Sequence, residues 1–297
     1  MAASTWRTRD GVSPKLGREG HAISTAHAAS TVLIAIGAGL LLSVNLYLAA
    51  RSFGHIVGGT QAVDWVQYVE ASRRIEAGDL YAVTDTYAYR YSPLLAPVFG
   101  LLAPLGTIAW QGLHIVAAVA LPSWPLRLAA VVSWPFWYDV ETGNVMVFIL
   151  LAAAWALTGS RLATGAYLIM AILIPRPLML PVAAWLLWKR PEWRLPFAAA
   201  VAAHALAVLA IGWGPEWIGT IIAAGRDADL PSNVGPSRFV GTLPWLVIGL
   251  PLAAWLTRRG RVGLASIAAS PYWLPYYLIM PLLELVRPRR EREGPTR

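Results

Sequence analysis

Apolar segments long enough to cross a bilayer recur along most of this 297-residue chain. The first covers residues 31–50, about the 20 residues that a membrane-spanning helix requires, and others continue as far as Val286. Only 13% of the residues are charged and 57% are hydrophobic, whereas soluble domains contain about 25% charged residues. The pattern predicts an all-α polytopic membrane protein and excludes a soluble domain with one anchor.

The two ends of the chain differ from this apolar part. Residues 1–28 are polar and basic and show no apolar periodicity, which indicates a disordered cytoplasmic tail. No small-residue cleavage site follows the first apolar segment, so we do not expect a cleaved signal peptide. A single transmembrane domain is predicted for residues 29–286, and residues 287–297 form a second basic tail.

Basic clusters predict the orientation, because Lys and Arg favour the cytoplasmic side of a membrane. Clusters in residues 7–18, 189–194, 258–261 and 287–297 are therefore placed inside. The net charge of +8 is a topology signal and not evidence for nucleic acid. Spans are predicted at residues 107–121, 127–138, 144–158, 162–174, 178–188, 195–213 and 239–257. With the broken segments included, we expect about 9–11 spans.

Two proline-rich segments do not fit simple spans. Residues 92–106 contain three prolines and are predicted to form a broken, re-entrant or interfacial segment on the outer side. Residues 262–286 are predicted to form two short helices that meet at residues 270–273. Non-helical backbone inside a membrane is tolerated only where protein or water forms hydrogen bonds with its N–H and C=O groups. This topology places the first extracytoplasmic segment, 51–92, and a loop at 214–240 on the outer side.

Asp64 is the most informative carboxylate in the chain. Residues 62–78 have the amphipathic pattern of a helix that lies on the outer membrane interface and ends at Gly78. Asp64 stands at its start with Gln67 three residues later, as in a capping box. Asp64 could therefore be a helix cap or a catalytic base, and these residues favour the two interpretations equally.

Further candidates lie on the predicted outer side. Tyr87, Tyr89 and Tyr91 alternate before Pro93, as an interfacial aromatic belt would or as a wall for a sugar ring or lipid phosphate. Arg176 lies between two prolines in an apolar stretch. It could extend to the membrane surface as a helix-end cation, or it could bind a phosphate group.

Other polar residues have weaker patterns. Asn144 precedes a clean apolar run and could cap that helix, while Asp139 and Glu141 are alternative carboxylates ranked below Asp64. The Asp-x-Asp pattern at residues 227–229 lies on a predicted outer loop without a Rossmann-like unit, so it is discounted. The chain has no cysteine and its five histidines are scattered, so the sequence predicts no metal ligand set.

The chain resembles glycosyltransferase family 87, the multi-spanning mannosyltransferases of the GT-C fold, over roughly residues 60–285. The similar blocks are Val63-Asp64-Trp65-Val66-Gln67-Tyr68, Gly78-Asp79-Leu80-Tyr81, Tyr89-Arg90-Tyr91-Ser92-Pro93-Leu94, Gly143-Asn144, Arg176-Pro177 and Ser270-Pro271-Tyr272-Trp273. The chain departs from the family at Asn144, where Gln is usual, and at Arg176, where Lys is usual. Tyr276 and Tyr277 stand at the family's His positions.

The resemblance implies a membrane hexosyltransferase of the bacterial inner membrane with an extracytoplasmic active site. Its donor would be a polyprenyl phosphate carrying one hexose, with mannose expected, and its acceptor a lipid or glycan. Asp64 would act as general base and the anomeric centre would invert, without a cofactor; the need for a divalent metal stays open. The residues expected to bind the donor phosphate and substrate are Arg176, Tyr89, Tyr91, Asn144, Glu141, Tyr276 and Tyr277.

The main alternative is a lipid or solute transporter or flippase, because interrupted helices and a cation near the midplane are typical of transporters too. Against it, the chain contains no internal repeat, and the polar residues gather on one predicted face. A non-catalytic scaffold and an inactive family member are further alternatives. Transport predicts that activity survives Asp64→Asn, whereas transfer predicts a mutation-sensitive site on the outer side.

Overall fold

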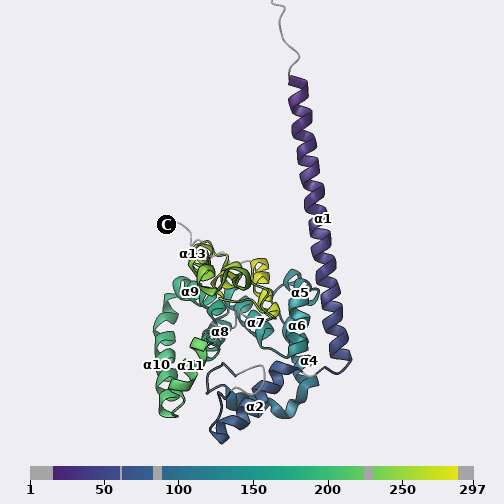
Figure 1. Cartoon of the computed structure of the whole chain (residues 1–297). Helices are drawn as coiled ribbons and strands as arrows, with labels where there is room; N and C mark the ends of the chain where they lie inside the picture. Colours follow the sequence, from purple (N-terminus) through teal and green to yellow (C-terminus); the bar gives the residue numbers. More distant parts are fainter. Residues whose placement is uncertain (1–15, 61, 83–88, 224–229, 287–297) are drawn as a thin grey trace, which may run out of the picture. The chain divides into compact units, whose positions relative to one another are not determined.

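A computed structural model describes residues 16–60, 62–82, 89–223 and 230–286 (Figure 1). Within these ranges the chain is all-helical and contains no strand, which confirms the predicted all-α class. Three described helical stretches are long and apolar enough to cross a membrane: Ser30–Val57, Ala96–Val119 and Pro191–Ala210. Shorter apolar helices occur at Met146–Leu157, Arg161–Leu173 and Pro177–Lys189. This composition supports a membrane protein.

The chain forms two compact units, Met1–Tyr47 and Leu48–Arg297. The first is described from Leu16 and consists of the N-terminal part of α1, which runs over Leu16–Val57. The helix begins inside residues 1–28, so the prediction of disorder throughout that segment was wrong. No Gly or Pro interrupts residues 21–36, and their alanines favour continuation of the helix toward the N-terminus.

The helix predicted for residues 62–78 is present as α2, Val63–Ala77. Its apolar face is buried through Trp65, Tyr68 and Ala71, and Gly78 ends it in the left-handed conformation at φ 79°. Helix α3, Ala96–Leu102, packs against α2. A 3₁₀ turn, Ala103–Leu105, and helix α4, Gly106–Val119, follow. The break predicted in residues 92–106 is therefore present.

The single span predicted for residues 127–138 was wrong, because two short helices take its place. Helix α5 covers Trp124–Val131 and α6 covers Trp134–Thr142. Pro135 is in the first turn of α6, and Ser133 before that helix is extended. Proline cannot donate the backbone hydrogen bond that would continue α5, so the chain starts a new helix.

The middle of the second unit is formed by α7, Met146–Leu157, most of whose side chains are buried. Helix α8, Arg161–Leu173, packs against it, and a 3₁₀ turn, Pro177–Met179, leads into α9, Leu180–Lys189. These helices lie where spans were predicted, at 144–158, 162–174 and 178–188, but they are shorter than the three stretches long enough to cross a membrane.

A third 3₁₀ turn, Pro191–Trp193, leads into the C-terminal helices. They are α10 at Arg194–Ala210, α11 at Gly214–Ala223, α12 at Ser237–Val240, α13 at Thr242–Arg258 and α14 at Val262–Ala269, followed by the 3₁₀ helix η5 at Pro275–Leu285. The predicted outer loop 214–240 thus contains α11 and α12 and is not a simple loop. The division of residues 262–286 into two short helices is confirmed.

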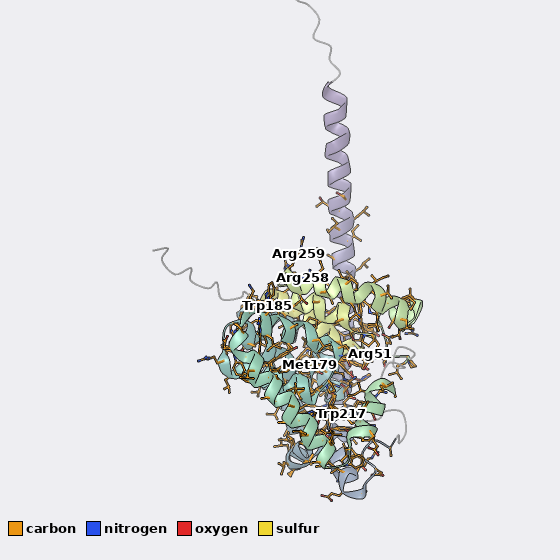
Figure 2. The ribbon with its side chains drawn as sticks, turned by 90° about the vertical axis from the view of Figure 1, so that its left-hand side faces the viewer. Arg51, Met179, Trp185, Trp217, Arg258 and Arg259 are labelled. Carbon is orange, nitrogen blue, oxygen red and sulfur yellow. The ribbon has the colours of Figure 1, made fainter. Side chains whose placement is uncertain are left out.

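Helices α13, α14 and η5 pack with their backbones in close contact. A Cβ atom on Gly263 of α14 would lie 2.5 Å from the Met280 carbonyl oxygen of η5, and Gly249 of α13 is similarly close to the Ala268 carbonyl. Glycine at such positions lets helices approach closely, as at helix interfaces in membranes. Helix α13 also packs on α9; Figure 2 labels Arg258 and Arg259 at the basic end of α13 and Trp185 on α9.

Candidate functional site

The predicted site residues meet at a partly open pocket in the second unit, with a cavity volume of about 80 Å³. Segments far apart in sequence form its walls: the start of α2, residues 89–91, the α6–α7 turn, Arg176 and the start of η5. Six of the eight predicted residues line it, namely Asp64, Tyr89, Tyr91, Asn144, Arg176 and Tyr276.

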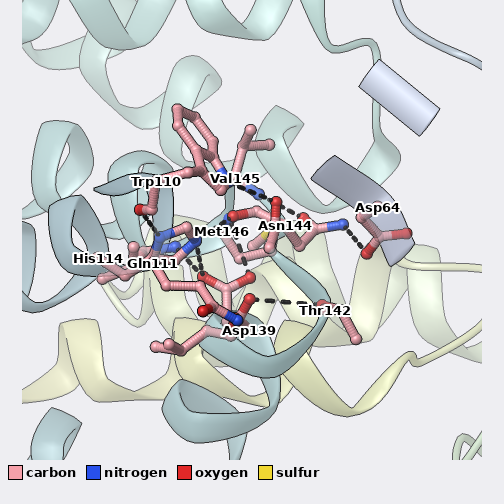
Figure 3. A network of polar contacts seen from close by, with 12 residues as sticks. Asp64, Trp110, Gln111, His114, Asp139, Thr142, Asn144, Val145 and Met146 are labelled. Atoms are coloured by element: carbon pink, nitrogen blue, oxygen red, sulfur yellow. Dashed lines mark hydrogen bonds and ion pairs between the residues drawn. The ribbon is translucent and has the colours of Figure 1, made fainter. Parts of the chain in front are cut away.

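Asp64 is the second residue of α2, and its side chain does not cap the helix. The N-cap residue is Ala62, which provides no side-chain cap, so the capping-box interpretation was wrong. The half-buried carboxylate instead accepts a hydrogen bond of 2.8 Å from the Asn144 side-chain nitrogen (Figure 3). Its place in the first turn of α2 is favourable, because the helix dipole attracts negative charge there.

Burial raises the pKa of Asp64 above its ordinary value. Hydrogen bonding from the Asn144 and Thr142 side chains and the positive charge of Arg176 act in the opposite direction. A carboxylate with a raised pKa is a stronger proton acceptor than an exposed one, and general bases work best when their pKa lies near the operating pH. The environment of Asp64 therefore suits a general base.

The α6–α7 turn positions Asn144. Gly143 ends α6 in the left-handed conformation at φ 69°, and a Cβ atom on it would lie 2.8 Å from the Cβ atoms of Ala62 and Trp65. The turn thus packs directly against the start of α2. The Asn144 side-chain oxygen accepts a hydrogen bond of 2.8 Å from the Val145 backbone N–H, which leaves its nitrogen to donate to Asp64.

Asp139, one of the alternative carboxylates, serves as a helix cap and does not line the pocket. It is buried and accepts hydrogen bonds from the backbone N–H groups of Met146, at 3.3 Å, and Val147, at 2.8 Å. These are donors at the start of α7 that have no partner within the helix. His114 braces the same turn, with its two ring nitrogens 2.9 Å from the Trp110 carbonyl and 2.6 Å from the Asn144 carbonyl (Figure 3).

Arg176 lies directly before the 3₁₀ turn Pro177–Met179 and is half-buried at the pocket. Its guanidinium donates a hydrogen bond to the Tyr272 hydroxyl and lies 5.4 Å from the centre of the Tyr91 ring. A planar guanidinium held in this way can present its remaining N–H groups to a phosphate oxygen.

The tyrosines of residues 89–91 belong to the core, so the alternative of an interfacial aromatic belt does not describe them. Tyr89 and Tyr91 are 3% and 4% exposed. The Tyr91 hydroxyl is 2.9 Å from the Tyr68 hydroxyl, and the Tyr89 hydroxyl donates to the Ser92 carbonyl at 3.0 Å. Tyr87 lies outside the described residues.

Two predicted site residues do not line the pocket. Glu141 is bonded elsewhere, with its carboxylate 2.6 Å from the His55 ring nitrogen Nδ1. The α6 residues that line the pocket are Tyr138 and Thr142, whereas Glu141 is directed toward His55. Tyr277 is buried behind the wall, with its ring 5.2 Å from that of Tyr276. The Asp-x-Asp pattern at 227–229 lies outside the described residues.

Three residues that sequence reasoning did not assign belong to the site. Tyr68 and Arg90 line the pocket, and Tyr272 receives the hydrogen bond from Arg176. All three occur within the sequence blocks similar to the family, which was the available signal. The described residues form no cluster of three or more His, Cys, Asp or Glu side chains.

Comparison with known proteins gives no match: no protein-family model, no curated protein and no solved structure matches this chain.

Proposed function

We propose that the protein is a membrane glycosyltransferase of the GT-C type that transfers a hexose, with mannose expected, from a polyprenyl phosphate to a lipid or glycan acceptor. The observation that carries the proposal is that Asp64 and Arg176, distant in sequence, line one pocket. One is a carboxylate with a raised pKa and the other a fixed cation. A general base and a site for an anionic leaving group are the two requirements of this transfer.

In the proposed reaction, a carboxylate oxygen of Asp64 takes the proton of the acceptor hydroxyl. The acceptor oxygen attacks C1 of the sugar while the bond between C1 and the phosphate oxygen breaks, so the anomeric centre inverts. The bonding electrons leave with the phosphate, which becomes a monoester dianion. Arg176 stabilises this developing charge with charge-assisted hydrogen bonds, and Asn144 holds Asp64 in position.

The tyrosines that line the pocket support the proposal that the substrate is a sugar. Tyr68, Tyr89, Tyr91, Tyr138 and Tyr276 line the pocket, and such rings combine an apolar face with a hydroxyl. In the proposed enzyme, Tyr276 replaces the family's histidine as a neutral hydrogen-bond donor near the phosphate. The three candidate spans support a membrane protein; the larger span count, the bacterial inner membrane and the extracytoplasmic side belong to the proposal.

The test is transfer by purified protein in nanodiscs, with radiolabelled polyprenyl-phosphate-mannose and a lipid extract of the source organism. We expect Asp64→Asn to lower the rate by about 10²–10⁴-fold, the usual contribution of a general base. The matched control is Glu76→Gln, the same chemical change on an exposed residue of the same helix, which should leave the rate unchanged. Equal transfer by wild type and Asp64→Asn would contradict the assignment of the base. A wild-type protein that does not bind the donor would favour transport.

A further inference from the structure

We infer that the side-chain amide of Gln67 recognises an acceptor hydroxyl next to the one that reacts, and that the acceptor is therefore a sugar and not a simple lipid alcohol. The inference rests on the proposed function, which leaves the acceptor open between a lipid and a glycan. The proposed mechanism gives Gln67 no role.

The first step is the place of Gln67 in the structure. The sequence pattern pairs it with Asp64 in a capping box, but the N-cap of α2 is Ala62, which has no side-chain cap hydrogen bond. The Gln67 side chain is instead half-buried and lines the pocket together with Asp64. Gln67 therefore belongs to the pocket and not to the cap of the helix.

The second step is that the Gln67 amide is available to a ligand. Within the described part of the chain it forms no hydrogen bond. The Asn144 amide is the contrast, because its nitrogen donates to Asp64 and its oxygen accepts from the Val145 backbone. The Ser232 hydroxyl also lines the pocket and is likewise without a hydrogen bond among the described residues. Two neutral polar groups thus face the pocket with their donors and acceptors unused.

The third step is the chemistry that such groups select. A side-chain amide presents N–H donors on one atom and a carbonyl acceptor on another, and a sugar hydroxyl both donates and accepts. A neutral amide favours a neutral polar ligand. A simple alcohol has a single hydroxyl, which is needed at the base, so it would leave the Gln67 amide unpaired. A site built to bond a substrate hydroxyl rejects an analogue that lacks it.

The fourth step assigns Gln67 to the acceptor. Residues three apart on a helix are neighbours on one face, with Cβ atoms about 5–6 Å apart, so Gln67 follows Asp64 along the pocket wall. Asp64 is the group proposed to take the proton of the reacting hydroxyl, whereas Arg176, proposed to hold the phosphate, belongs to a different segment. A hydroxyl on a neighbouring carbon of the acceptor can therefore bond to Gln67 while the reacting hydroxyl is at Asp64. Bonding to both side chains would fix which hydroxyl reacts.

The test is a cycle that combines a change in the protein with a change in the ligand, and it measures binding without donor. Full-length protein in nanodiscs is titrated with butyl mannoside, butyl glucoside, their monodeoxy analogues and butanol. In wild type, removal of one particular hydroxyl should weaken binding about 3–10-fold, the usual effect of losing one neutral hydrogen bond. Gln67→Met, which replaces the amide with an apolar side chain of similar length, should weaken binding of the parent sugar by the same factor. The analogue without that hydroxyl should bind this variant as tightly as the parent sugar does.

Val66→Met is the matched control. Val66 is the preceding residue of α2, it is 45% exposed and it does not line the pocket, so this variant should keep all the wild-type affinities. In the transfer assay, Gln67→Met should raise KM for the sugar acceptor. The acidic limb of kcat/KM, which reports the ionisation of Asp64, should stay at its wild-type position.

If Gln67→Met still discriminates against every deoxy analogue by the wild-type factor, the inference is overturned, because Gln67 would then bond to none of the removed hydroxyls. Wild-type protein that binds butanol as tightly as both sugars would overturn it as well. Loss of discrimination against a deoxy donor, and not against a deoxy acceptor, would assign Gln67 to the donor hexose and contradict the inference. Coupling between Gln67 and a sugar hydroxyl in a protein without transfer activity would support recognition of a sugar and contradict the enzyme, so the two failures are distinguishable.

Discussion

The Asn144 side-chain nitrogen lies 2.8 Å from the Asp64 carboxylate, although the two residues are 80 positions apart in sequence. This hydrogen bond joins the α6–α7 turn to the first turn of α2. Because the oxygen of the same amide is bonded to the Val145 backbone, the amide cannot rotate without losing both interactions. The orientation of the carboxylate is thereby fixed.

Asn144→Ala should shift the pH dependence of transfer. The Asn144 hydrogen bond lowers the pKa of Asp64, against the dominant effect of burial, so its removal raises that pKa further. A base must be ionised, and the rate falls as pH falls through the pKa. The acidic limb of kcat/KM should therefore move to higher pH in the variant. A limb at the wild-type position would show that Asn144 does not act on Asp64.

Asp64→Asn should keep or increase thermal stability. The pKa of Asp64 in the folded protein is raised above the ordinary value of 3.8, so ionisation of the buried group costs stability. The cost is absent at pH values below the pKa of Asp64 in the unfolded protein. It grows as the pH rises from that value to the raised pKa in the folded protein, and it is complete above the raised pKa. Asparagine removes the charge and can still accept the Asn144 hydrogen bond. Its Tm should equal or exceed that of wild type at neutral pH, with no such gain in acid. A large loss of Tm at neutral pH would contradict this explanation.

Gly143→Ala should destabilise the protein and abolish transfer. Alanine is strained at φ 69°, and its Cβ would lie 2.8 Å from the Cβ atoms of Ala62 and Trp65. We expect a loss of about 1–3 kcal/mol in the free energy of unfolding, as for other overpacked sites. Gly112→Ala is the matched control, because its added Cβ meets nothing within 4 Å in α4, and it should gain about 0.5–1 kcal/mol. Equal stabilities measured by denaturant titration would show that the α6–α7 turn does not pack closely on α2.

Asp139→Ala should lower the stability of the protein and leave the pH profile of the remaining activity unchanged. The variant loses the acceptor for the Met146 and Val147 backbone N–H groups, and loss of a helix cap costs about 0.5–2 kcal/mol. Asp139→Asn retains one acceptor oxygen and should be less affected. If Asp139→Asn instead kept its Tm and lost the acidic limb of the rate profile, Asp139 and not Asp64 would be the base.

Local features of the sequence were sufficient to predict the helical class and most of its interruptions. Proline and glycine interrupt a helix within a few residues of their own position. The ends of α2 and the break between α14 and η5 could therefore be predicted from the sequence alone. The convergence of Asp64, Arg176 and Tyr276 was expected because the topology predicted from the basic clusters put all three on one side, and the pocket brings these residues together.

Other features that depend on distant contacts could not be predicted. No pattern near Glu141 shows that it bonds to His55 and not to a substrate, and none near Asp139 shows that it caps α7. Arg90 was overlooked because a charged residue between two tyrosines fits an exposed stretch equally well. Only tertiary packing, which buries both neighbouring tyrosines, places Arg90 at the pocket.

The pocket is built where helices begin, end or are interrupted, and this has a consequence for biosynthesis. Asp64 leaves the ribosome long before Arg176, and Tyr276 follows only near the end of translation. No single contiguous segment forms the pocket, so the proposed base and the cation stay apart until these segments have been synthesised and have packed together. The nascent protein therefore has no assembled pocket for the proposed substrate until η5 has packed against α6 and α14.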